Sequence, residues 1–409
     1  MKSMSILVLV LFSNCIYSQS GLYDEIIPKF RKEILSTENL QNENNSRILR
    51  DLSFVGAYEE LYYRSSYSDS TIVNEIKGIL KSYEPTKAID LILSKTSSEQ
   101  IVIINESHHR PEHRKFTADL LEELYQQGYR YLALEAIFSN QLARYTNYPE
   151  NKYFLGDTTI HKRGYPLMNA SSGTYVKEPA FGNMIRKALK LGYKIIGYEE
   201  NSKTRELNQA RNLAKLFEDE PMAKLVVHCG FGHLIEAPTM WKGKMDTVMA
   251  GHLKALTQID PLTIDQTKYY NYSDVSEIVF KDIEDSSPQC LVLKDIVFNS
   301  HLTEEQAYWD ITVFHPPMAY TEGRPNWLVL DSTNNEFTIS SDKICIEYPI
   351  RIRLLEENDR YDAVPIDVLE AYEIKDTYSL YGNIDKAKIV VENQNGDRQI
   401  IRQEYIVSR

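Results

Sequence analysis

The chain has 409 residues, of which 43% are hydrophobic and 25% charged, and its formal net charge is −12. These values are ordinary for a soluble globular protein, and the length allows one large domain with accessory segments. Because lysines and arginines are scattered and outnumbered by acidic residues, we expect neither nucleic acid nor an anionic membrane surface as the main partner.

The first residues, 1–18, are typical of an export signal, with a basic residue before a short apolar core at 6–12. The residues in front of Cys15 make a poor lipobox, so we expect signal cleavage rather than lipid attachment there. No later segment has 18 uncharged apolar residues, so we expect no transmembrane span and a periplasmic or secreted protein. The remaining cysteines are too few and too odd in number for a disulfide framework: Cys229, Cys290 and Cys345.

Residues 19–97 are expected to form an N-terminal helical region. Apolar residues recur with helical spacing around 23–35, 47–63 and 71–95, and the Asn-rich stretch 41–46 should interrupt them.

From residue 98 strands and helices alternate, and we assign residues 98–340 to an α/β core. The apolar run 101–104, a helix opened by Pro111 and stopped by Gly128, and the run 131–134 predict a β–α–β unit with parallel strands. Further alternation predicts a mainly parallel sheet flanked by helices: strands at 193–198 and 224–228, and helices at 180–191, 204–218 and 245–257.

Two later stretches depart from this alternation. Residues 145–179 are rich in Tyr, Gly, Ser and Pro, and a loop of that length is usually functional, so we expect it to set substrate specificity. From about residue 290 the pattern predicts strands, one of them at NWLVLDS. Residues 341–409 are expected to form a small antiparallel β appendage with a turn at NQNGD.

Carboxylates and imidazoles follow each predicted parallel strand. Because ligands bind outside the carboxyl ends of the strands in open parallel sheets, we expect these side chains to share one cleft. They are Glu106, His108 and His109 after the first strand, Glu135 after the second, Glu199 and Glu200 after the third, and His228 and His233 at the fourth.

The histidines and Glu135 also have structural interpretations. His108 and His109 point in opposite directions if the strand continues, so only one should face the cleft, and each is open to a purely structural role bonded to backbone. His113 is expected to be a solvated helix residue. Burial of Glu135 costs several kcal/mol unless it meets a cation, a proton or a metal, which favours a functional role.

The order of these motifs resembles a superfamily that joins erythromycin-esterase-like proteins, ChaN haem-binding lipoproteins and the TraB/Tiki group. The likeness rests on residues 105–109, on Glu135 and on residues 230–233, and covers about residues 98–260. It implies an EreA/ChaN-like fold for the core.

The branches of this superfamily imply different chemistry. The esterase branch pairs a glutamate with a histidine three positions later, here Glu106 and His109, and acts on water without a metal. A helix motif of that branch matches residues 205–212 except at Gln209.

The Tiki branch is metal-dependent and uses two Gly-x-x-His motifs. Residues 230–233 keep one of them, whereas Asn105 replaces the glycine of the other. The ChaN branch has Glu-x-His before a histidine-rich helix start, which residues 106–114 resemble.

We therefore expect a hydrolase that attacks an ester or amide of a small-molecule or peptide substrate. His108 or His109 would be the general base, oriented by Glu106 or Glu135. The remaining roles would fall to the other cleft residues: Arg114, Glu199 and Arg205 in substrate binding, and His228 or His233 as acid or oxyanion donor.

Two cofactors and one non-enzymatic role remain open at this stage. A divalent metal (Zn, Mn or Co) would be held by His108, Glu135 and His233. Alternatively the protein binds haem or another iron compound, with Tyr165 and Tyr175 on its apolar face. A third reading is a non-catalytic envelope interaction module that uses the β appendage.

Overall fold

The computed structural model describes residues 25–405, except 82–83, 139–156, 158, 170–171, 201, 242, 285–286 and 293–307. The expected export signal, Cys15 and much of the 145–179 loop therefore lie outside the described residues. Within them, no helix has the length and apolar character needed to cross a membrane.

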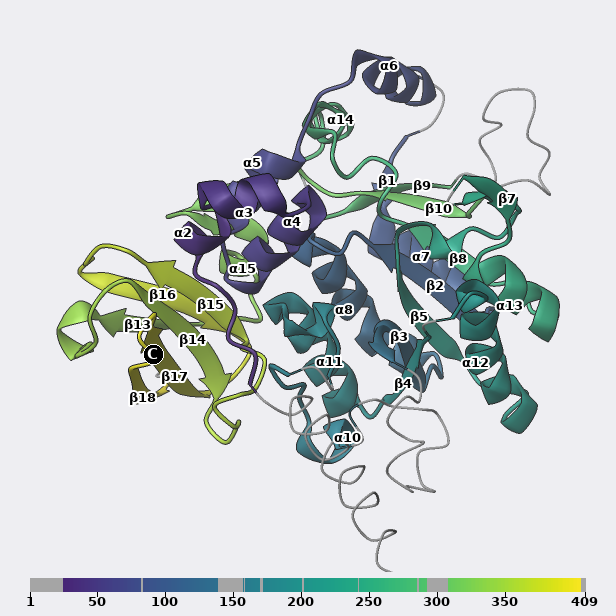
Figure 1. Cartoon of the computed structure of the whole chain (residues 1–409). Coiled ribbons are helices and arrows are strands. Elements are labelled where there is room, and N and C mark those ends of the chain that lie inside the picture. The colour runs from purple at the N-terminus through teal and green to yellow at the C-terminus, as the bar shows by residue number, and fades with distance from the viewer. Residues whose placement is uncertain are drawn as a thin grey trace, which may run out of the picture.

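An eight-stranded sheet forms the centre of the α/β core, in the order β1-β9-β10-β8-β2-β5-β3-β4 (Figure 1). The six strands from β10 to β4 are parallel, whereas β9 and β1 continue one edge in antiparallel pairing. A mainly parallel α/β sheet was predicted, and the structure confirms it. The strands are β1 (Thr86–Lys87), β2 (Ile101–Glu106), β3 (Tyr131–Phe138), β4 (Lys194–Glu199), β5 (Leu225–Gly230), β8 (Leu262–Asp265), β9 (Gln289–Val292) and β10 (Ile311–Phe314).

Helices cover both faces of this sheet. Successive side chains of a strand point to opposite faces, so Val102 and Ile104 of β2 pack with one helix layer and Ile101 and Ile103 with the other. Burial of each such side chain contributes about 1.5–3 kcal/mol, and both layers thus hold the strands in place. The first layer is α7 (Ala88–Thr96), α8 (Pro111–Gln126) and α11 (Pro179–Leu191), and the second is α12 (Arg205–Asp219) and α13 (Met249–Thr257).

The β2–α8–β3 unit forms with parallel strands, but β5 lies between β2 and β3. Strand order depends on pairing between residues more than 90 positions apart, which local patterns do not encode.

The N-terminal helices are shorter than predicted. The side chain of Asn44 accepts backbone N–H bonds from Ser46 and Arg47, which starts a new helix inside the predicted break. Gly56, with φ of +69°, divides the predicted helix 47–63, and a Cβ there would lie 2.2 Å from the Val368 carbonyl oxygen. The helices are α2 (Arg31–Ile34), α3 (Thr37–Asn42), α4 (Asn45–Phe54), α5 (Tyr58–Ser65) and α6 (Ser70–Ile79).

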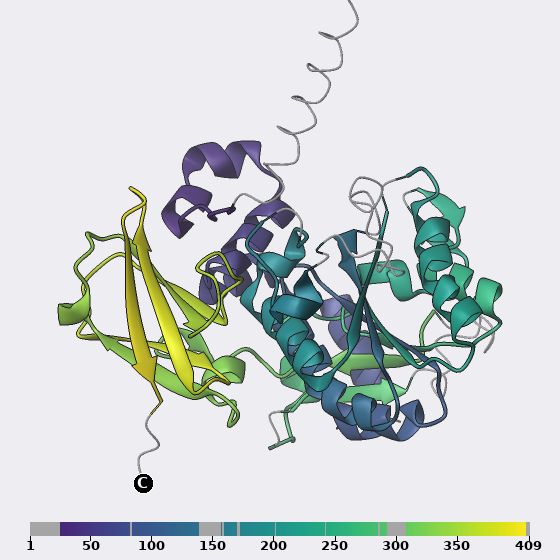
Figure 2. The same cartoon turned by 90° about the horizontal axis from the view of Figure 1, so that it is seen from below.

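The C-terminal strands form a separate antiparallel unit beside the α/β core (Figure 2). A four-stranded sheet has the order β15-β14-β17-β18, and β13 pairs with β16. The predicted turn at NQNGD joins β17 to β18. The strands are β13 (Asn335–Ser340), β14 (Ile350–Glu356), β15 (Asp367–Ala371), β16 (Thr377–Gly382), β17 (Lys386–Asn393) and β18 (Arg398–Glu404).

The strand predicted at NWLVLDS is wrong, because its first residues form the helical turn α15 (Asn326–Val329) after Pro325. A run of four apolar residues fits a strand and a helical turn equally well. The remaining short elements are α10 (Ile160–Arg163), η1 (Tyr175–Lys177), η2 (Phe231–Leu234), β6 (Thr239–Trp241), β7 (Lys244–Asp246), α14 (Ser273–Val279), β11 (Tyr320–Thr321), β12 (Arg324–Pro325) and η5 (Ser341–Lys343).

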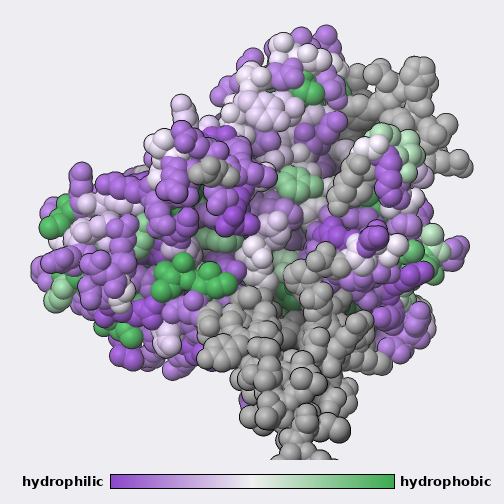
Figure 3. Space-filling model, viewed as in Figure 1, coloured by the Kyte–Doolittle hydropathy of each residue, from purple (hydrophilic) through white to green (hydrophobic). Residues whose placement is uncertain are grey.

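The surface seen in Figure 3 is mainly hydrophilic, with hydrophobic residues in small separate areas. The described residues on this face thus form no broad apolar surface.

Candidate active site

The ends of β2, β3 and β5 bring three predicted site segments together. Glu106 lies opposite Gly230 in the parallel β2–β5 register. The backbone N–H of Gly230 donates to the carboxylate of Glu135, in the second half of β3. Two buried carboxylates from different strands thus lie on either side of Gly230, at the edge where parallel sheets bind ligands.

His108 is the imidazole that reaches this edge. Its Nδ1 lies 3.1 Å from Glu106 Oε1, its ring stacks on Tyr175 with centroids 3.9 Å apart, and Phe231 meets it edge-on. Its side chain is 23% exposed, whereas Glu106 is 3% exposed. A carboxylate therefore orients an imidazole that solvent can still reach.

Gly230 makes room for that imidazole. A Cβ at this position would lie 2.3 Å from His108 Cε1, 2.7 Å from its Nε2 and 3.3 Å from Glu135 Oε2. Its φ of −89° is open to any residue, so the glycine is needed for close approach and not for backbone conformation.

Arg114 binds Glu106 from the buried side of the cleft. Its guanidinium donates to both Glu106 oxygens, to Glu178 and to the His108 carbonyl oxygen, and it is fully buried. The expectation that Arg114 contacts a ligand is therefore wrong, because each of its three guanidinium nitrogens donates to a group inside the protein. It acts as a positioning residue for Glu106.

A second cluster surrounds Arg205 at the start of α12. Arg205 makes a two-pronged ion pair with Glu199, donates to Glu135 at 2.6 Å, and places Nη1 3.0 Å from His233 Nε2. The other nitrogen of His233, Nδ1, lies 2.7 Å from Glu206. Arg205 is 24% exposed, so it and His108 are the most open members of this set.

Ion pairs and hydrogen bonds keep the cleft carboxylates ionised. Burial alone would raise the pKa of Glu106, but Arg114, His108 and His228 hold it well below its usual range. Burial also opposes ionisation of Glu135, and His233, His108 and Arg205 more than offset it, so its pKa is lowered. The cleft therefore keeps two negative charges at neutral pH.

His233 is placed to take up a proton. Burial lowers its pKa, but Glu135 and Glu206 outweigh burial and the net effect raises it. The neutral ring accepts from Arg205 at Nε2. The protonated ring presents its Nε2–H to Glu135 Oε1, 3.3 Å away.

His228 and Cys229 lie inside the sheet layers and not in the cleft. His228 is 1% exposed, with Nε2 3.2 Å from Glu106 Oε2 and Nδ1 3.2 Å from Thr117 Oγ1. It thus supports Glu106 from the helix-covered side, and its predicted role as acid or oxyanion donor does not fit this burial. Burial raises the pKa of the Cys229 thiol well above its usual range, as suits an inert core residue.

His109 and His113 turn away from Glu106. His109 Nδ1 lies 3.3 Å from Ser107 Oγ, and the ring packs against Tyr270, so the predicted Glu106–His109 pair is replaced by Glu106–His108. His113 is fully buried, contrary to the expectation of a solvated helix residue. Burial, with Arg110 next in effect, lowers the pKa of His109 to about 3, so it is neutral at pH 7.

The divalent metal that the sequence suggested at His108, Glu135 and His233 stays a prediction. In the part of the chain that the structure describes, no three His, Cys, Asp or Glu side chains are grouped to hold a metal ion. Between Glu135 and His233 the cation is the Arg205 guanidinium.

The histidine-rich helix start does not offer a haem ligand at His113. The Ser107 N–H donates to His113 Nδ1, so the neutral ring carries its proton on Nε2 and has no lone pair there for iron.

Sequence reasoning missed two carboxylates of the site. Glu178 caps α11 by accepting the Ala180 and Phe181 N–H groups and also binds Arg114. Its position before Pro179 at a helix start was a usable signal for the cap. Glu206 lies one residue after Arg205, inside the predicted helix, and only the fold shows that it faces His233.

No family model and no curated protein matches the chain. Among solved structures, the type III effector HopBA1 is similar at 15% identity, over 44% of this chain and 84% of that chain, with a TM-score of 0.30. The RRSP effector domain of a MARTX toxin from Vibrio vulnificus CMCP6 is similar at 14% identity, over 57% of this chain and 46% of that one, also with a TM-score of 0.30. Similarity of this degree carries no argument about function.

Proposed function

We propose that the protein is a hydrolase in which His108 removes a proton from water that attacks an ester or amide. The observation that carries this proposal is the Glu106–His108 pair at an open strand edge, with Glu106 ionised and held by the buried Arg114. Such a carboxylate-oriented imidazole is the usual arrangement of a general base.

The hydrogen bond to Glu106 fixes the tautomer of His108. With its proton on Nδ1, the ring has its Nε2 lone pair directed to the Gly230 side of the cleft, where Glu135 also lies. Glu106 stabilises the imidazolium that forms when Nε2 takes the proton, and it does not itself need to accept that proton.

Arg205 and His233, on the side of Glu135 away from His108, would stabilise the oxyanion and protonate the leaving group. Arg205 is partly exposed and fixed by two carboxylates, so it can face the oxygen that becomes negative in a tetrahedral intermediate. A protonated His233 would supply the proton that the leaving group needs.

The resemblance to the esterase-like and Tiki branches also supports a hydrolase, with one change to the expected pairing. The base is His108, two positions after Glu106, and no step requires a metal. We also propose, from residues 1–18 alone, that it acts outside the cytoplasm.

The test uses the mature protein against a panel of nitrophenyl esters and fluorogenic amides. His108→Gln should lower kcat/KM for any substrate found by about 10²–10⁴-fold. His109→Gln is the matched control and should stay close to the wild type, because its ring lies outside the cleft.

EDTA should leave the wild-type rate unchanged. Equal losses in His108→Gln and His109→Gln would contradict the assignment of the base. A Soret band in the purified protein would favour the haem-binding alternative over hydrolysis.

A further inference from the structure

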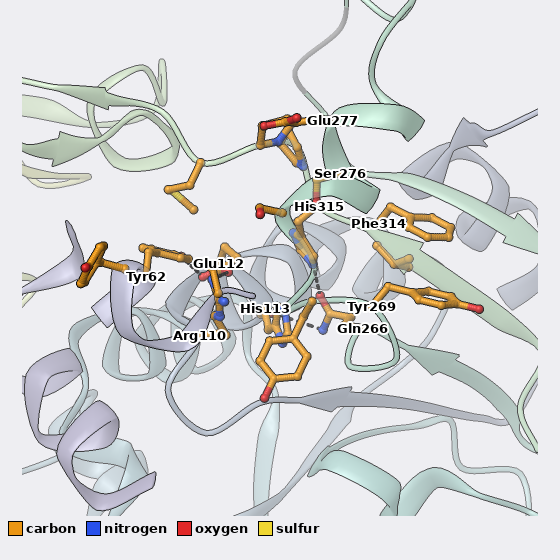
Figure 4. Close-up of a pocket in the computed structure, with 18 of the residues that line it drawn as sticks. Tyr62, Arg110, Glu112, His113, Gln266, Tyr269, Ser276, Glu277, Phe314 and His315 are labelled. Carbon is orange, nitrogen blue, oxygen red and sulfur yellow. Dashed lines mark hydrogen bonds and ion pairs between the residues drawn. The ribbon is translucent and has the colours of Figure 1, made fainter. Parts of the chain in front are cut away.

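A pocket of about 350 Å³ lies beside the cleft but does not include Glu106, His108 or Glu135 (Figure 4). We call it the Arg110–His113 pocket, after two residues from the start of α8 that line it. The rings of Tyr270 and Phe231 contact each other, and while Tyr270 contacts His113, Phe231 contacts His108. These two rings stand between the pocket and the proposed base.

Three buried polar groups on the pocket wall lack a hydrogen-bond partner among the described residues: His113 Nε2, Arg110 Nε and Tyr320 Oη. An unpaired buried polar group costs about 1–3 kcal/mol, so three around one cavity need an explanation. A ligand that accepts their hydrogen bonds provides one.

All three groups are donors. Ser107 N–H donates to His113 Nδ1 at 3.0 Å, which places the proton of the neutral ring on Nε2. Burial and His315 hold the pKa of His113 well below its usual range. Burial raises the pKa of Tyr320 above the usual value of a tyrosine. His113 is thus neutral and Tyr320 protonated at pH 7, so the three unpaired groups of these lining residues are N–H and O–H donors.

The pocket is aromatic and has no surplus of positive charge. The Arg110 guanidinium lies over the rings of Tyr62 and Tyr270, at 4.4 and 5.2 Å, and Glu112 lies 3.6 Å from it. Glu59 and Glu277 also line the pocket. An anion would be repelled by these carboxylates, and a cation could not accept the hydrogen bonds of the three buried donors, so a neutral acceptor suits the wall better than either.

We propose that the Arg110–His113 pocket binds a planar aromatic or heteroaromatic compound without net charge that carries a carbonyl oxygen or a ring nitrogen as acceptor. Its volume lies within the range of small-molecule sites, and aromatic walls with a few convergent polar groups are typical of them. The site is independent of the proposed hydrolysis.

The experiment measures binding of four probes to the mature protein by isothermal titration calorimetry. Benzamide carries the ring and the neutral acceptor. Benzoate has a similar shape with a negative charge, benzylamine has a positive charge and no carbonyl, and cyclohexanecarboxamide lacks the flat ring. Benzamide should bind most tightly of the four.

Two tyrosine variants give a matched test of the location. Tyr320→Phe removes an unpaired hydroxyl from the pocket wall and should weaken benzamide by about 5-fold. Tyr198→Phe removes a buried hydroxyl that likewise has no partner among the described residues, from the core on the other face of the sheet, and should leave the affinity unchanged. Neither change removes a hydrogen bond that the structure describes, so both proteins should fold.

His113→Phe should weaken benzamide by about 10-fold or more, because the N–H is lost while a flat ring remains. Benzoate or benzylamine binding more tightly than benzamide would overturn the proposal. So would equal effects of Tyr320→Phe and Tyr198→Phe, or the absence of binding by all four probes.

Discussion

Two regions of this molecule bury clusters of opposite charges, and they differ in how completely they do so. At the strand ends of the α/β core, Glu106 and Glu135 are buried, but His108 and Arg205 remain about a quarter exposed. In the C-terminal sheet, Arg351 and Arg353 of β14 have side chains only 1% and 4% exposed.

The arginines of the C-terminal sheet are paired with buried carboxylates, although Arg351 Nη1 and Arg353 Nε have no hydrogen-bond partner among the described residues. Glu370 and Glu392 on the neighbouring strands bind them, and the N-terminal segment covers them with Glu25 and the Lys29 carbonyl. This network connects the N-terminal segment to β14, and its two arginine side chains are almost fully shielded from solvent. The two clusters differ in the solvent exposure of one or two charged side chains and not in their number of charges. We therefore assign a catalytic role to the strand-end cluster and a structural role to the Arg351–Arg353 cluster.

The largest expected effect tests the structural role of the Arg351–Arg353 cluster. Arg351→Met should lower the free energy of unfolding by about 3 kcal/mol, because Glu370 would stay buried without its cation and Glu392 would lose one of its three arginines. Hydrolysis per folded molecule should not change. Urea denaturation measures the loss, with Arg402→Met on the exposed side of β18 as the control. Equal losses in both variants would remove the contrast between the two regions.

The next effect tests the cleft. Gly230→Ala should reduce kcat/KM by about 10²-fold with little change in stability, because the new Cβ displaces His108 and not the backbone. Gly78→Ala in α6 is the control, since a Cβ there meets nothing within 4 Å. Full activity in Gly230→Ala would show that the position of His108 does not matter for the reaction.

The smallest effect concerns the histidines behind the cleft. Burial lowers the pKa of His315 to about 3, below the value of about 6.5 in an unfolded chain. The unfolded state therefore binds this proton first as the pH falls, so the contribution of His315 is complete above pH 6.5 and is lost below it.

In His315→Gln this loss should disappear. Between pH 6.5 and 5.0 the variant should lose about 1.6 kcal/mol less stability than the wild type, as measured by urea denaturation at each pH. His252→Gln on α13 is the control and should follow the wild type. Parallel pH profiles for His315→Gln and the wild type would mean that His315 is not held neutral by the fold.

Local sequence patterns predicted much of the core. The run at 101–104 followed by Pro111 and the later stop at Gly128 located β2 and α8, because these signals act within one or two turns of chain. The helical N-terminal region was predicted, whereas its division at Asn44 and Gly56 follows from a cap and from a contact with Val368.

The site was predictable as a set of strand-end residues but not as a set of pairs. Glu135 lies 3.3 Å from His233 and accepts from the Gly230 N–H, and Glu106 lies opposite Gly230 on the neighbouring strand. The choice of His108 over His109 depends on how the chain turns after Glu106, and on Gly230 from another strand leaving room for the ring.

The sequence by itself determined the alternation of strands and helices and the polar groups at the strand ends, because both depend on neighbours close in the chain. Only the tertiary structure decided that β5 separates β2 from β3, that Arg114 is an internal support, and that His113 faces a pocket. Those outcomes depend on residues distant in sequence. Burial and charge pairing, which set the chemistry of each group, exist only once these residues are packed together.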